Sequence, residues 1–140
     1  MTMLAHPSPS ETYRRIDFDA RVAGADPGQL VVMCLEQLTS ALGSALFADE
    51  CGDNRKKSGS LTRALSALTA LELGVDRDQP IAAALLQLYA AARKAVLDSV
   101  VTFDRSTIAR VRADFQEVGR ELARHDSATP TMGRMLNNGG

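Results

Sequence analysis

Aromatic residues are scarce in this chain. They make up 4% of its 140 residues, and tryptophan is absent. The chain is rich in alanine and leucine and has few β-branched runs, a composition that favours helices over sheets. A domain of this length buries about two thirds of its unfolded surface, so one core suffices. The composition therefore predicts a single all-α domain.

Net charge is also nearly absent, because the chain has 16 lysines and arginines and 17 acidic residues. No sequence-wide positive field exists to hold phosphates, so nucleic acid is not an expected partner. The opening stretch MTMLAHPSPS lacks the basic and apolar regions of a signal peptide. Nowhere do about 18 apolar residues run uninterrupted. We therefore expect a cytoplasmic protein without membrane insertion.

Residues that carry catalysis or bind metals are few. The two histidines, His6 and His125, stand near the chain ends, where a lone histidine is more often solvated than catalytic. Cys34 and Cys51 lack CxxC spacing and nearby histidines, so they are expected as free thiols and not as zinc ligands. Phosphate-binding glycine loops and nucleophile elbows are missing. The sequence thus predicts no enzyme, no metal and no cofactor.

The stretch GADPGQLVVMCLEQL, residues 24–38, opens the first predicted helix, which ends near Asp49. Asp26 is the expected N-cap, Pro27 takes the first helical position, and Gln29 completes a variant of the capping box. Apolar residues then surround the helix instead of lining one face. Such a helix is either deeply buried or partly reserved for a partner.

Spacings of three and four between apolar residues predict two further helices. The second is expected to be firm only from Ser60, because the basic run at 55–57 suits a helix N-terminus poorly. The third has Asp78 as its cap and Pro80 in its opening turn. Its apolar face is too wide for a single seam, since four residues lie off the predicted inner stripe: Leu86, Tyr89, Leu97 and Val101.

The fourth predicted helix is amphipathic and is capped by Asp104 or Ser106. Helices of this length joined by short loops pack most simply as an antiparallel up-down four-helix bundle, expected over residues 26–125. Residues 1–25 are expected to form a flexible leader that holds a candidate capping segment, and residues 126–140 a disordered tail.

The order and spacing of several short motifs resemble the FliS family of flagellar export chaperones. The resemblance covers residues 13–125 and rests on Tyr13, ADPGQLVVM, LTRALSAL, the VD pair, IAAALLQLY and FDRSTIARV. It implies an antiparallel helical bundle in the cytoplasm that binds the disordered C-terminal region of flagellin. Such a chaperone prevents premature polymerisation and assists delivery to the flagellar type III export gate.

The resemblance also implies a binding surface and a self-cap. The expected flagellin-binding residues, on the first three predicted helices, are Leu30, Met33, Leu65, Leu68, Leu88, Tyr89, Ala92 and Val96. In the family, the N-terminal segment can fold back over its own hydrophobic surface when no client is bound. The residues expected to form that cap here are Tyr13, Ile16 and Phe18. Aromatic positions of the family are occupied by Leu35, Ala91 and Leu122, which indicates a divergent member.

A second hypothesis stays open beside the chaperone. The surplus apolar surface is also consistent with the alternative of a non-catalytic helical module that self-associates or serves as an adaptor for another partner. The expected oligomeric state is a monomer or a weak homodimer. Size measurements over a dilution series, with and without flagellin, separate the two hypotheses.

Overall fold

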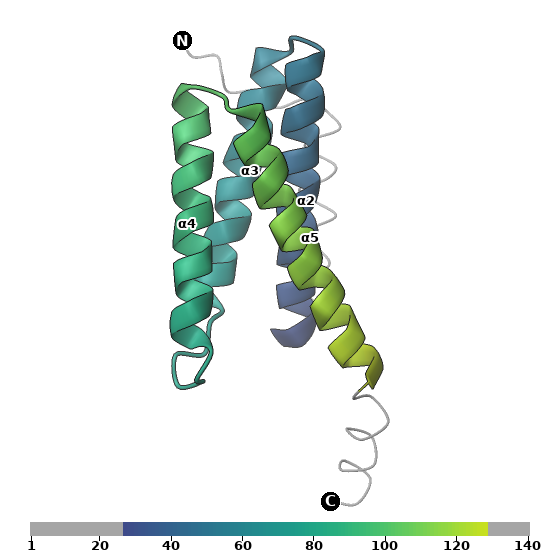
Figure 1. The fold of residues 1–140 in the computed structure, drawn as a ribbon, viewed down its shortest axis with the longest axis vertical. Helices are drawn as coiled ribbons and strands as arrows, with labels where there is room; N and C mark the ends of the chain where they lie inside the picture. Colours follow the sequence, from purple (N-terminus) through teal and green to yellow (C-terminus); the bar gives the residue numbers. More distant parts are fainter. Residues whose placement is uncertain (1–26, 129–140) are drawn as a thin grey trace, which may run out of the picture.

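The computed structural model describes residues 27–128, which form four helices (Figure 1). They are α2 (Pro27–Glu50), α3 (Asn54–Leu73), α4 (Ala82–Val101) and α5 (Arg105–Ala128). No strand occurs within this described part. Successive helices run in opposite directions, so the predicted antiparallel up-down bundle is confirmed. The predicted leader with its capping segment, residue 26 and residues 129–140 lie outside the described residues.

α2 is apolar around much of its circumference because it packs against two neighbours, α3 and α5. Leu38 and Leu42 are fully buried, and buried alanines at 41, 45 and 48 allow close approach of the other helices. Within the described residues, the segment Gly28–Glu50 is also long and apolar enough to cross a membrane. The core helix of a bundle has the same length and composition, and α2 is such a helix here.

α3 begins at Asn54, so the prediction of a firm helix only from Ser60 is wrong. Asp53 is the N-cap, and its side-chain oxygen accepts a hydrogen bond of 3.0 Å from the backbone N–H of Lys56. A carboxylate at this position interacts favourably with the positive end of the helix dipole. It thereby offsets the basic residues of the first turn.

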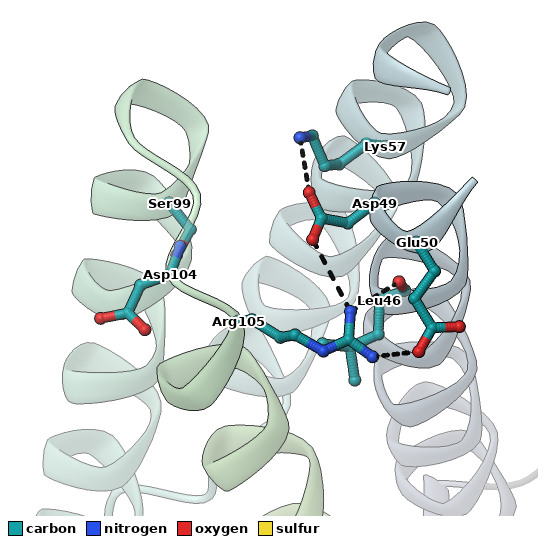
Figure 2. A network of polar contacts seen from close by, with 7 residues as sticks. All are labelled: Leu46, Asp49, Glu50, Lys57, Ser99, Asp104 and Arg105. Carbon is teal, nitrogen blue, oxygen red and sulfur yellow. Dashed lines mark hydrogen bonds and ion pairs between the residues drawn. The ribbon is translucent and has the colours of Figure 1, made fainter. Parts of the chain in front are cut away.

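An ion-pair cluster joins the C-terminus of α2 to the first turns of α3 and α5 (Figure 2). Lys57 Nζ lies 3.0 Å from Asp49 Oδ1, and Arg105 Nη1 lies 3.6 Å from the other oxygen of that carboxylate. The Arg105 guanidinium also contacts Glu50 at 2.5 Å and donates to the carbonyl of Leu46 at 3.1 Å. Three helix ends are thus held together at one end of the bundle.

The loop between α4 and α5 is ordered by local polar contacts. Asp104 Oδ1 accepts hydrogen bonds from the backbone N–H of Thr107 at 3.2 Å and from the Ser106 hydroxyl at 3.0 Å. These hydrogen bonds, led by that from Thr107, hold the pKa of the Asp104 carboxyl below its usual value. Of the two predicted caps for this helix, Asp104 is the one that acts. The neighbouring Phe103 ring lies 4.8 Å from the Lys57 ammonium.

α4 begins at Ala82, later than its predicted start. Asp78 does not cap the helix, because it lies three residues before the N-cap position, in a turn where its backbone N–H donates to Asp76 Oδ1. Pro80 belongs to that turn as well, and the residue before a proline is biased away from helical geometry. Ile81 occupies the N-cap position without a side-chain hydrogen bond. The predicted cap and opening turn are therefore corrected.

Candidate functional site

α4 carries more apolar residues than the core of the bundle covers. Leu97, Val100 and Val101 are 47%, 53% and 86% exposed. Together with the partly exposed Leu86 and the exposed Ala90, Leu97 and Val100 recur at helical spacing along one side of the helix. An exposed stripe of this length is unusual for a helix whose opposite side is already packed in a core.

The apolar side of α4 borders α3. Arg93, within the same stripe, donates to Glu72 Oε1 at 2.8 Å through Nε and to Thr69 Oγ1 at 2.8 Å through Nη2. Because α3 and α4 are antiparallel, we infer that Leu65, about one turn before Thr69, lies at the level of Leu97, about one turn after Arg93. We call this surface the α3/α4 apolar face, defined by Leu65, Leu86, Ala90, Leu97 and Val100.

The predicted flagellin-binding residues fall into two groups. The first is buried within the bundle and consists of Met33, Leu68, Tyr89, Ala92 and Val96. The second is half-buried and consists of Leu30, Leu65 and Leu88. Of all eight, Leu65 is the residue that belongs to the α3/α4 apolar face. The predicted cap residues Tyr13, Ile16 and Phe18 lie outside the described residues, so that role stays a prediction.

Tyr89 points into the core, contrary to its predicted place off the inner stripe. Its ring stacks on that of Phe115, with centroids 6.1 Å apart and planes 19° apart. Burial raises the pKa of the Tyr89 hydroxyl, and the neighbouring Cys34 adds to the rise. Burial likewise raises the pKa of the Cys34 thiol. Both groups are therefore neutral at pH 7, as expected in an apolar core.

The sequence did contain a signal for the exposed face. Leu86, Leu97 and Val101 lie off the predicted inner stripe, and the structure places all three at least partly in solvent. These three residues were nevertheless absent from the predicted binding residues, which included residues of the inner stripe such as Val96. A surplus of apolar residues beyond one stripe is thus the feature that locates the face.

A second apolar depression lies between α2 and α5. This α2/α5 groove has a volume of about 370 Å³, and Val32, Leu35, Phe115, Gly119 and Leu122 are among its lining residues. α2 and α4 each pack against both α3 and α5, so the groove and the α3/α4 apolar face lie on opposite sides of the bundle. No cluster of three or more metal-ligating side chains occurs in the described part of the chain.

Comparison with known families identifies the family of the chain. The family model described as flagellar protein FliS matches residues 9–121. The matched range is well over half of the chain and includes all of α2, α3 and α4 and most of α5. Among the curated proteins, none matches the sequence.

Proposed function

Because the chain belongs to the FliS family of flagellar chaperones, we propose that it binds the C-terminal region of flagellin in the cytoplasm. Binding would keep newly made flagellin from polymerising and would assist its delivery to the flagellar type III export gate. The family is non-enzymatic, so the chain is not an enzyme. Its activity is the recognition of another chain.

The α3/α4 apolar face is the surface best suited to this client. Amphipathic helices bind by laying one apolar face into a hydrophobic groove, with anchors at helical spacing. Leu86, Leu97 and Val100 supply such spacing on α4, and Leu65 supplies an apolar border from α3. The exposure of these aliphatic side chains in an otherwise packed bundle is the observation that supports the proposal most strongly.

The Arg93 bridge to α3 supports a directional mode of binding. It interrupts the apolar face with a half-buried charge pair to Glu72. A bound helix would place apolar residues over Leu86 and Leu97, on either side of the bridge, and a polar residue over the bridge itself. Apolar contacts would then supply most of the affinity, and the bridge would fix the register.

Calorimetric titration tests the proposal. The protein is titrated with full-length flagellin monomer and with the same flagellin lacking its C-terminal segment. We expect 1:1 binding with a sub-micromolar Kd, which corresponds to a binding free energy more favourable than about −8 kcal/mol. Truncation of flagellin should abolish this binding. Equal binding of both flagellins, or binding of neither, would overturn the proposal.

Substitutions on the bundle surface test the position of the site. Leu97→Asp places a charge in the middle of the α3/α4 apolar face and should weaken flagellin binding by about 1–4 kcal/mol. Phe47→Asp is the matched control, since Phe47 is 59% exposed on α2 and outside the face. Circular dichroism and Tm establish that both variants are folded. Undiminished binding by a folded Leu97→Asp variant would exclude this face.

Self-association through the same face is the competing outcome. If a second copy covers the α3/α4 apolar face, sedimentation should show a dimer that Leu97→Asp converts to a monomer. Flagellin would then leave the dimer unchanged. A monomer that forms a 1:1 complex with flagellin distinguishes the chaperone from the self-association module.

A further inference from the structure

One side of α3 faces α4 and borders the α3/α4 apolar face. Thr69 and Glu72 on this side contact Arg93 of α4. Spacings of three and four place six residues along it: Arg55, Ser58, Thr62, Leu65, Thr69 and Glu72. Arg55 and the neighbouring Lys56 are exposed in the first turn of α3. This border of the face therefore begins with basic residues at one end of the bundle.

The opposite end of the face has the opposite charge. The turn that joins α3 to α4 contains Asp76 and Asp78, both exposed, with Arg77 between them. Residues 82–92, which form the first half of α4, include no charged residue. The turn end of the face is therefore net acidic, whereas the end at the start of α3 is net basic.

Neighbouring charges reduce the basic character of the α3 end without cancelling it. Lys57, the third basic residue of this run, is paired with Asp49 at 3.0 Å. The Asp53 carboxylate accepts a hydrogen bond from the backbone N–H of Lys56. It opposes one of the two positive charges of Arg55 and Lys56. An excess of positive charge thus stays at this end of the face.

We propose that the client helix lies on the α3/α4 apolar face antiparallel to α3, with its C-terminal end beside Arg55 and Lys56. This inference rests on the proposed function, because it gives a direction to the same client. The macrodipole makes the C-terminal end of a helix negative and the N-terminal end positive. In this direction the positive end lies beside Asp76 and Asp78. Apolar contacts supply affinity in either direction, so the charged ends select one of the two.

Photocrosslinking of the full-length protein to flagellin monomer tests the direction. The photoreactive residue benzoylphenylalanine replaces Thr62 in one variant and Ala83 in another, because these exposed residues are near opposite ends of the face. Crosslinked flagellin residues are identified by mass spectrometry. We expect the residues crosslinked from position 62 to lie C-terminal, in the flagellin sequence, to those crosslinked from position 83.

The outcomes separate the direction from the function. The reverse order of crosslinks would overturn the antiparallel direction and leave the proposed function intact. An absence of crosslinks from both positions, in variants that still bind flagellin 1:1 in calorimetry, would also overturn it, because the client then lies elsewhere. Failure of the parent protein to bind flagellin would refute the proposed function and the direction together.

Charge reversal at the basic end provides the second test. The double substitution Arg55→Glu and Lys56→Glu should leave the bundle folded, as measured by circular dichroism, because acidic residues suit the first turn of a helix. A favourable charge at a helix end contributes a factor of about two to five. Its reversal should therefore raise the Kd for flagellin at least about fivefold at low salt. In 1 M salt, where the Debye length is about 3 Å, the difference should largely vanish.

A control variant with the same change in net charge isolates the effect of position. Arg110→Glu and Arg124→Glu alter two exposed residues of α5, which does not border the face. This variant should keep the Kd of the parent protein. A folded variant with Arg55→Glu and Lys56→Glu that binds flagellin as tightly as the parent at low salt would overturn the proposed direction.

Discussion

At the scale of single residues, substitution of Tyr89 should affect the stability of the bundle and not a direct contact with flagellin. It is 4% exposed and stacked on Phe115, which is itself 1% exposed. We predict that Tyr89→Ala lowers the free energy of unfolding by about 3–5 kcal/mol, because it removes a buried ring and leaves a cavity. Urea denaturation followed by circular dichroism measures the change. Reduced flagellin binding by this variant would then report partial unfolding and not a lost contact.

Tyr89→Phe is the control for this residue, because it keeps the stacked ring. It should preserve both the urea midpoint and flagellin binding. If Tyr89→Ala were as stable as the parent protein, the core position of the ring would be wrong. Sequence reasoning placed Tyr89 off the inner stripe of its helix, in which successive residues are about 100° apart. A small error in the orientation of the inner stripe is therefore enough to exchange buried and exposed neighbours.

At the scale of elements, Arg105 anchors the first turn of α5 to the end of α2. It contacts the Leu46 carbonyl and the carboxylates of Asp49 and Glu50, but it is 47% exposed. Because solvent screens the charges, each exposed ion pair contributes about 0.2–1 kcal/mol to the free energy of unfolding. We therefore predict that Arg105→Ala lowers the free energy of unfolding by about 1–2 kcal/mol, measured by urea denaturation.

The geometry of the guanidinium provides the control for Arg105. Arg105→Lys should not recover the full stability, because an ammonium cannot reproduce a planar fork that reaches several acceptors. Arg110→Ala, an exposed position on the same helix, should change the urea midpoint little. Equal midpoints for Arg105→Ala and Arg110→Ala would show that the cluster does not anchor α5.

The existence of all four elements follows from the sequence, but some of their boundaries do not. Apolar spacing predicts the helices, and the cap at Asp104 is local enough to be recognised. The start of α3 at Asn54 was missed because Lys57 finds a partner in Asp49 of another helix. The exposed side of α4 was missed for a similar reason. The spacing of apolar residues shows that α4 has more of them than one buried stripe needs. Only the positions of α3 and α5 decide which of these residues stay exposed.

At the scale of the whole molecule, the bundle has apolar surfaces on two opposite sides. α2 and α4 lie diagonally, each between α3 and α5. The α3/α4 apolar face and the α2/α5 groove therefore share no helix. A ligand in the groove and a client on the face would therefore not compete for the same surface.

The combined substitution of Tyr13, Ile16 and Phe18 by serine tests the predicted N-terminal cap. If the cap is a lid that competes with flagellin, the Kd for flagellin should become tighter, because the loss of a competitor increases the population of the open face. Circular dichroism establishes that the variant is folded, and calorimetric titration measures the Kd. An unchanged Kd together with unchanged solubility would refute the predicted cap.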